Sequence, residues 1–494
     1  MKTPKIPHPE WALKFRTKGT ELRRINGRYY LYSVTSKWDK ERKVTKKITL
    51  GMIGAITEQN GLTPKGSTTS KKVETSTSSI DLKARPTSSK EFGATSALLS
   101  VGSDILSGLR KYFPLDASVI FTLAMQRLLY QSPLKNMEFY YLESFLSEQL
   151  PGLNLNKNHM TELLKKIGSD RESVVKFMKQ LSSGASHIAF DTTHIISQSK
   201  NLGMNYQGYN SVGDYEPQVN LFYLFAVDQK KPVYFRLIPG NISGLKALKL
   251  TIEEAGLEKS VLIGDKGLAS EANIQWLEEV GLDYILPLRR NSRFMDTTRL
   301  ESRRYQDAFD GHFFFQKRSI FYYSYVQEGQ KCMMFVDSKL RAEEERDYLR
   351  RIQDGYEGYD MKSFRQKELS FGSILLVTNI DGVGPEEIYI KYKTRMEVET
   401  MFDVFKNTIE ADRTYMQSQE SLEGWLLINH VATVLYYELY ARLKEAKLLA
   451  HITPSDLLLR LARVSKIKIG DKWVTAEINS KTSRLLTTLN LSVT

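Results

Sequence analysis

Four side chains between residues 385 and 409 have types and spacing suited to phosphate. Counted from the first, they lie at offsets of zero, three, seven and fourteen: Tyr392, Arg395, Glu399 and Lys406. On a helix that turns by about 100° per residue, they fall within an arc of about 60°. Charged Arg and Lys offer a metal ion no lone pair, but they pair with phosphate oxygens, Arg as a fork and Lys as a point charge. We therefore expect this face to meet a phosphate-bearing ligand.

The same stretch carries the start signal of a helix. Gly384 and Pro385 precede two glutamates, which places proline at the first helical position and acids at the positive end of the helix dipole. The pattern predicts one long helix over residues 385–409. A plainer interpretation stays open, because Arg395 and Glu399 are also spaced as an i,i+4 ion pair on a solvated face.

Two aspartates upstream follow apolar runs that read as strands. Asp191 ends the run HIAFD, and Asp265 follows Ser260 to Gly264 and opens Asp-Lys-Gly. Acids at the carboxyl ends of strands lie where α/β sheets usually bind ligands. A turn cap for Asp191 and a helix N-cap for Asp265 are the alternatives. His194 is interpreted as a polar loop residue rather than a metal ligand.

Composition narrows the class of protein. The 494 residues include 70 Lys+Arg and 57 Asp+Glu, a net charge of +13 that favours a polyanionic partner, with nucleic acid first. The single Cys332 excludes an intramolecular disulfide framework and a multi-cysteine zinc site, and it suits a reducing, cytoplasmic location. The N-terminus lacks a signal-peptide core, and polar residues interrupt the most apolar run, residues 425–440, so no membrane role is expected.

The elements that must position these side chains form a mixed pattern. Residues 21–56 predict a small β module rich in Lys, Arg and Tyr, whose face either clamps a duplex or is simply solvated. Helical spacing follows over residues 96–150, and a further helix is predicted over Met160 to Leu181. The expected segments are a basic β-rich module (1–62), a Ser/Thr-rich linker (63–95), a helical segment (96–182), a core in two parts (183–290 and 373–415), a β-rich insertion (291–372) and a helical C-terminal region (416–494).

The spacing Tyr392-x2-Arg395-x3-Glu399-x6-Lys406 resembles the signature of DDE-type insertion-sequence transposases. The likeness covers roughly residues 185–450, and the family's Asp-x-Gly is matched at Asp265. It implies an α/β fold with a ribonuclease H-like core, in which a mixed sheet is flanked by helices and interrupted by the β-rich insertion. It also implies that Glu399 is the third catalytic acid beside Asp191 and Asp265. The sequence departs from the family in the insertion, which holds no tryptophan to stack on a base of the transposon end.

The resemblance implies a chemistry as well as a fold. Asp191, Asp265 and Glu399 would hold two Mg²⁺ ions, with Mn²⁺ as a substitute, about 3.5–4 Å apart for cutting at transposon ends and joining the 3′-hydroxyls to target DNA. Tyr392, Arg395 and Lys406 would bind the DNA. The implied partners are double-stranded terminal repeats and target DNA, bound by a dimer when two ends are paired. Two alternatives stay open: a transposase-derived DNA-binding protein that does not cut, and a nuclease that cuts without joining.

Overall fold

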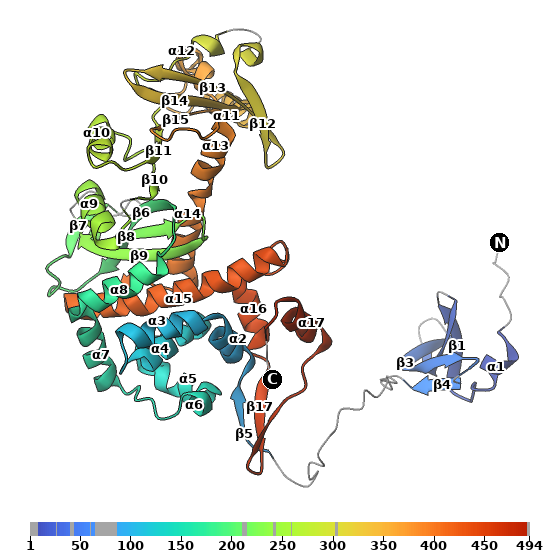
Figure 1. Ribbon diagram of the computed structural model, residues 1–494. Helices are drawn as coiled ribbons and strands as arrows, with labels where there is room; N and C mark the ends of the chain where they lie inside the picture. The colour runs from blue at the N-terminus through green and yellow to red at the C-terminus, as the bar shows by residue number, and fades with distance from the viewer. Residues whose placement is uncertain are drawn as a thin grey trace. The chain divides into compact units, whose positions relative to one another are not determined.

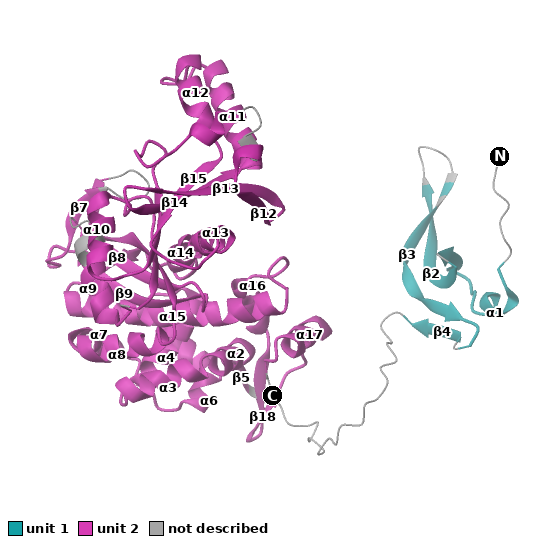
Figure 2. Cartoon of the chain, turned by 45° about the horizontal axis from the view of Figure 1, so that its top comes forward, with its two compact units in different colours: residues 1–83 teal, residues 84–494 magenta. Residues whose placement is uncertain are grey.

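The structure, a computed structural model, describes residues 8–25, 27–39, 44–59, 61–64, 86–209, 215–240, 244–257, 259–301 and 305–491. The chain divides into two compact units, residues 1–83 and 84–494, coloured separately in Figure 2. Most of the predicted linker, residues 65–85, lies outside the described part. Among the described helices, none combines the length and the apolar character needed to cross a membrane.

In the first unit, four antiparallel strands form one sheet in the order β1-β2-β3-β4. The bounds are Glu10–Leu13 (α1), Thr20–Ile25 (β1), Arg28–Asp39 (β2), Val44–Thr57 (β3) and Gly61–Pro64 (β4). The buried side chains of Leu22, Leu31 and Ile56 cluster with Ala12 of α1. This small core fixes the helix on one side of the sheet.

The second unit begins with a strand and seven α-helices among its described residues. They are Pro86–Glu91 (β5), Gly93–Val101 (α2), Ser103–Tyr112 (α3), Ala117–Tyr130 (α4), Met137–Glu143 (α5), Leu146–Gln149 (α6), Lys157–Ser169 (α7) and Arg171–Leu181 (α8). The single helix predicted over Met160 to Leu181 is wrong. It divides at Asp170, whose side chain accepts a hydrogen bond of 3.1 Å from the Ser173 amide and so caps α8. β5 lies within the range predicted as linker and pairs with a C-terminal strand, β17.

A large mixed sheet forms the centre of this unit. Its first strands and helices are His187–Ser197 (β6), Tyr206–Tyr209 (β7), Tyr215–Ala226 (β8), Lys231–Pro239 (β9), Gly244–Ala255 (α9), Val261–Ile263 (β10), Glu271–Glu279 (α10) and Tyr284–Leu288 (β11). The strands β9, β8, β6, β10 and β11 lie side by side in that order. β8 is antiparallel to its neighbours, whereas β10 runs parallel to β6 and β11. The fold is therefore mixed α/β.

The segment predicted as a β-rich insertion continues this sheet. It contains Gly311–Phe315 (β12), Arg318–Gln327 (β13), Gln330–Asp337 (β14), Ser338–Gln353 (α11) and Met361–Lys367 (α12). β14 pairs with Ser373–Thr378 (β15), and β15 pairs in turn with β11. The insertion is thus joined to the core through backbone hydrogen bonds and is not a separate layer.

The C-terminal part is built around one long helix. The remaining elements are Pro385–Thr394 (α13), Met396–Asp403 (α14), the π-helical turn Val404–Thr408 (η5), Arg413–Thr414 (β16), Gln419–Glu445 (α15), Pro454–Leu461 (α16), Ser465–Ile469 (β17), Lys472–Thr475 (β18) and Ser480–Thr488 (α17). Figure 1 shows α15 running between strands β8 and β9 and helices α3 and α4, and it contacts both β9 and α4. Most of its residues from Ser421 to Leu439 are buried. This helix joins the N-terminal helices and the sheet into one core.

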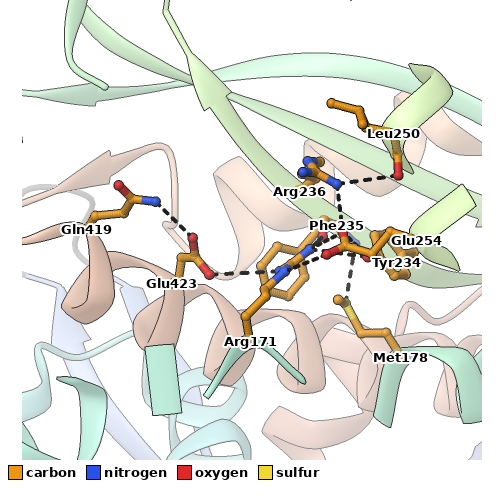
Figure 3. Close-up of polar contacts among 9 residues, drawn as sticks. All are labelled: Arg171, Met178, Tyr234, Phe235, Arg236, Leu250, Glu254, Gln419 and Glu423. Carbon is orange, nitrogen blue, oxygen red and sulfur yellow. Dashed lines mark hydrogen bonds and ion pairs between the residues drawn. The ribbon is translucent and has the colours of Figure 1, made fainter. Parts of the chain in front are cut away.

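A cluster of charged side chains fastens helices to the outer strand β9. Arg171 of α8 and Arg236 of β9 both pair with Glu254 of α9, at 2.9 and 2.7 Å. Figure 3 shows Glu423 of α15 on the other side of the Arg171 guanidinium, at 3.9 Å. Two arginines thus share two half-buried carboxylates, which compensates the charge within the cluster.

Candidate active site

Asp191 and Asp265 lie at the same level of two neighbouring parallel strands. Ala189 of β6 pairs with Ile263 of β10, and each aspartate is two residues further along its own chain. The prediction that a strand ends at Asp191 is wrong, because β6 continues to Ser197 by pairing with β8. The pairing of β6 with β10 ends two residues earlier, at Ala189. Both aspartates therefore lie beside the carboxyl end of β10, where α/β sheets usually bind ligands.

The loop after β10 holds Asp265 by its own backbone. Its Oδ1 accepts a hydrogen bond of 3.0 Å from the Gly267 amide, as the Oδ1 of Asp191 does at 2.8 Å from the Thr192 amide. A Cβ on Gly267 would lie 3.2 Å from the Oδ1 of Asp265, which is tighter than nine in ten real Cβ contacts. The glycine of Asp-Lys-Gly thus leaves room for the carboxylate.

Glu399 is linked to Asp191 through an arginine. Arg395 Nη2 donates a hydrogen bond of 2.9 Å to Glu399 Oε1, while its Nη1 lies 3.9 Å from Asp191 Oδ2. The Arg395 side chain is only 13% exposed, whereas that of Glu399 is 55% exposed. The largely buried guanidinium of Arg395 therefore lies between Asp191 on the strand and Glu399 on the helix.

The acids influence one another electrostatically. Burial raises the pKa of Asp191 to about 6; the negative charges of Asp265 and Glu399 add to the rise, and the Thr192 hydrogen bond and Arg395 oppose it. Within the described residues, no three Asp, Glu, His or Cys side chains are placed closely enough to hold a metal ion. In this structure Arg395 compensates the negative charges of Asp191 and Glu399.

A cavity of 430 Å³ opens beside Asp265 and Glu399, whereas Asp191 is not among the residues that line it. Its wall includes Asp265, Tyr392, Arg395 and Glu399, and it extends to Arg290 in the loop after β11 and to residues of the insertion. Arg290 is paired with Glu344 of α11 at 2.8 Å. The cavity is lined by both acidic and basic side chains, and its volume is large enough for a ligand larger than an ion.

Two further cations line this cavity that the sequence reasoning missed, Lys266 and Lys393. Neither has a carboxylate within ion-pair distance among the described residues. Burial lowers the pKa of Lys393; Asp337 opposes the change, while Arg318, Lys266 and Arg395 add to it. Lys266 follows Asp265 in the sequence, and Lys393 follows Tyr392. No pattern in the sequence distinguishes these two lysines from lysines that are simply exposed to solvent.

Lys406 lies apart from the other residues of the predicted face. It does not line the cavity, but it is near enough to Asp191 and Asp412 to feel their charges, and burial lowers its pKa. It also lowers the pKa of His194, after the larger effect of burial. Asp191 therefore has two cations nearby: Arg395, at 3.9 Å, and Lys406, which interacts with it electrostatically.

The single helix predicted over residues 385–409 is wrong in detail. It divides at Arg395, where the amide of Arg395 bonds to the carbonyl of Tyr392 and α14 starts anew. Its last turn is the wider π-turn η5, in which the Ile409 amide bonds to the carbonyl of Val404. Tyr392, Arg395 and Glu399 still line one cavity, whereas Lys406, which lies on η5, does not.

The end of η5 is held by a buried arginine. Arg127 of α4 donates hydrogen bonds to the carbonyls of Ile409 and Glu410, the latter at 3.2 Å, and to Asn429 Oδ1 of α15 at 3.1 Å. These bonds satisfy carbonyls at a helix end that would otherwise lack partners. Arg127 thus fixes the segment that carries Lys406.

Residues 182–435 match the family described as the transposase DDE domain. Among solved structures, the chain is similar to a piggyBac transposase synaptic complex with hairpin DNA, at 12% identity and a TM-score of 0.35, over 70% of this chain and 69% of that one. A Mos1 transposase paired-end complex with the left transposon end matches at 12% identity and a TM-score of 0.14, over 31% and 53%. No curated protein matches the chain.

Proposed function

Because the chain belongs to the family of transposases with a DDE domain, which covers slightly more than half of it, we propose a specific DNA chemistry for this protein. The protein cuts phosphodiesters at the ends of a transposon and joins the freed 3′-hydroxyls to target DNA. Asp191, Asp265 and Glu399 are its catalytic acids. The observation that carries this proposal is the common level of the two aspartates, with Arg395 linking Asp191 to Glu399.

The strand order supports the finer assignment of the fold. In a ribonuclease H-like core, three antiparallel strands are followed by two parallel ones, with the first strand in the middle of the sheet. The order β9-β8-β6-β10-β11, with α9 and α10 as connections, agrees with this description. We therefore assign residues 183–290 and 373–415 to such a core.

The chemistry of the side chains fits a divalent metal ion, which transposases of this family generally use. Carboxylate oxygens are the ligands that Mg²⁺ prefers. The pKa of Asp191 is raised first by burial and further by the charges of Asp265 and Glu399, so a nearby cation would stabilise its charged form. Asp191, Asp265 and Glu399 would hold the metal. Two bound Mg²⁺ ions would supply activation of the attacking oxygen and stabilisation of the leaving oxygen.

Three other residues position the DNA in this proposal. Arg395 pairs with backbone phosphate as a fork, Lys406 as a point charge, and Tyr392 contributes its phenol from the cavity wall. Because Arg395 now bridges two acids, its move to a phosphate leaves both carboxylates free for metal. Binding of DNA and of metal are thereby coupled through one guanidinium.

The partners and location follow from the same proposal. The protein binds double-stranded DNA at the transposon's terminal repeats and at the target, and it acts as a dimer when two ends are paired. It works where the DNA is, in the cytoplasm of the cell. The predicted insertion, residues 291–372, lines the cavity through Asp337, Leu340 and Glu344 and so contacts the bound strand.

One assay separates this function from its alternatives. The purified protein is incubated with DNA carrying both ends of its own element, with Mg²⁺ or with a chelator. We expect nicks at the ends and joined products with Mg²⁺ only. Binding without nicks would indicate a DNA-binding protein derived from a transposase, and nicks without joining would indicate a nuclease.

A further inference from the structure

The positive charge of this protein is concentrated in its first unit. Residues 1–83 contain 18 Lys+Arg and 7 Asp+Glu, so they carry +11 of the chain's net +13. The second unit, with five times as many residues, is nearly neutral in net charge. Since phosphate neutralisation supplies most of the affinity of DNA-binding proteins, the unit with the catalytic acids is not where most of that attraction arises.

One face of the β1–β3 sheet is polar. Arg23 of β1 donates a hydrogen bond of 2.7 Å to Thr49 of β3, and its guanidinium lies 4.7 Å from the ring centroid of Tyr32. Lys47 pairs with Glu21 at 2.8 Å, and Arg23 pairs with the same carboxylate. These five side chains define the outer face: Glu21, Arg23, Tyr32, Lys47 and Thr49. Two cations share one acid there, so one positive charge is left uncompensated.

The strands β2 and β3 extend beyond the rest of the sheet as a two-stranded ribbon. β1 pairs with β2 only up to Ser33, and β4 pairs with β3 only from Gly54, whereas β2 and β3 stay paired as far as Asp39 and Val44. At about 3.4 Å per residue, the unflanked part is roughly 17–20 Å long. Figure 2 shows this ribbon projecting from the teal unit.

The ribbon continues the outer face with an exposed aromatic ring. Ser36 pairs with Lys47, and two residues further Trp38 pairs with Thr45, so alternation places Trp38 on the same face as Lys47. Trp38 is 57% exposed. Lys37, between them, points to the opposite face and is exposed. The ribbon thus has one face with Trp38 and Lys47 and another with Lys37.

We propose that the N-terminal unit binds duplex DNA through this outer face, with the ribbon in the major groove and Arg23 and Lys47 on backbone phosphates. The major groove of B-form DNA admits a two-stranded ribbon, whereas that of A-form RNA is too deep and narrow for it. The proposal extends the proposed function, in which DNA is the substrate, but it concerns binding rather than cutting.

The test uses the full-length protein and a random-sequence DNA duplex, with affinity measured over a range of salt concentrations. In the double variant Arg23→Gln/Lys47→Gln we expect the slope of log affinity against log salt to fall by about 0.9–1.8, since each lost phosphate contact removes about 0.9 and Glu21 compensates one of the two charges. Trp38→Ala should weaken binding with the slope unchanged, because the ring contacts base edges in the groove but carries no charge. The charge-conserving variant Arg23→Lys/Lys47→Arg should restore the slope, which separates loss of charge from loss of fold.

Lys37→Gln is the matched control, because it removes a charge from the same ribbon on the opposite face. It should leave the slope unchanged. An unchanged slope in Arg23→Gln/Lys47→Gln, an equal loss in Lys37→Gln, or tighter binding of an RNA duplex would overturn the proposal. Cutting at saturating DNA concentration reports on the catalytic acids separately, so the two proposals fail independently.

Discussion

Arg395 donates a hydrogen bond of 2.9 Å to Glu399, one turn further along the chain, and the same guanidinium lies 3.9 Å from Asp191. The spacing of an ordinary i,i+4 ion pair is therefore present, as the plainer interpretation of the sequence expected. The pair nevertheless has a third member, because Asp191 arrives from a strand some 200 residues earlier in the chain. This three-residue contact is the basis for the first prediction.

Arg395→Ala should weaken binding of the cleaved DNA end and reduce the salt slope of binding by about 0.9, because one phosphate contact is lost. Metal affinity should survive, since a charged guanidinium is no ligand. Titration with Mn²⁺ and salt-dependent DNA binding measure the two effects. The exposed Arg350, paired with Asp347 on α11, gives the control Arg350→Ala. Equal losses of metal affinity in Arg395→Ala and Glu399→Ala would contradict the assignment.

Lys393 should contact a phosphate next to the cut, because it lines the cavity without a carboxylate partner among the described residues. Lys393→Met is expected to weaken binding of the transposon end roughly tenfold, the value of one charge-assisted hydrogen bond. Lys391→Met is the control, since Lys391 on the same helix pairs with Glu387 at 2.6 Å.

DNA ends with single neutral methylphosphonates identify the contacted phosphate. One such substitution should weaken binding of the wild type and of Lys391→Met, yet have little further effect on Lys393→Met. If every substitution affects Lys393→Met as strongly as the wild type, Lys393 does not touch the strand.

Arg127→Met should destabilise the second unit by about 2–4 kcal/mol, because it leaves the buried carbonyls of Ile409 and Ser132, and the partly buried one of Glu410, without their donor. Thermal unfolding measures the loss. The exposed-site variant Arg350→Met should stay within about 0.5 kcal/mol of the wild type. A loss below about 1 kcal/mol in Arg127→Met would show that η5 is held by other contacts.

His430 should make the protein acid-sensitive. Its ring is fully buried, bonded to the Tyr223 hydroxyl, and burial lowers its pKa to about 3 from an ordinary value of 6.5. Below about pH 6.5 the unfolded chain takes up a proton that the folded ring refuses, so the free energy of unfolding falls as the pH decreases toward 3. The contribution of this group is at most about 1.4 kcal/mol per pH unit.

Denaturant unfolding at about pH 7 and about pH 5 tests whether the free energy of unfolding falls as the pH decreases. His430→Gln, which has no proton to gain, should lose less stability between the two pH values than the wild type. The same loss in both proteins would show that other groups cause the acid sensitivity.

Much of the site could be predicted from sequence because its residues follow local patterns. The apolar runs before Asp191 and Asp265 lie in β6 and β10, and the helix start at Pro385 is where it was expected. The parallel pairing that brings the two aspartates to one level is long-range, and only the resemblance suggested it. Periodicity also missed the break at Arg395 and the π-turn at η5. The end of η5 is held by a long-range partner, Arg127, which no local pattern indicates.

Nicking of transposon-end DNA by conservative variants tests the central claim most directly. Asp191→Asn, Asp265→Asn and Glu399→Gln keep the side-chain shape but remove the charge that binds metal, so each should lose nicking by several orders of magnitude and still bind DNA. Glu397→Gln is the control on the same helix, because Glu397 pairs with Lys444 at 3.2 Å, and it should nick normally. Full nicking by any one of the three variants would contradict the assignment of Asp191, Asp265 and Glu399 as one catalytic site.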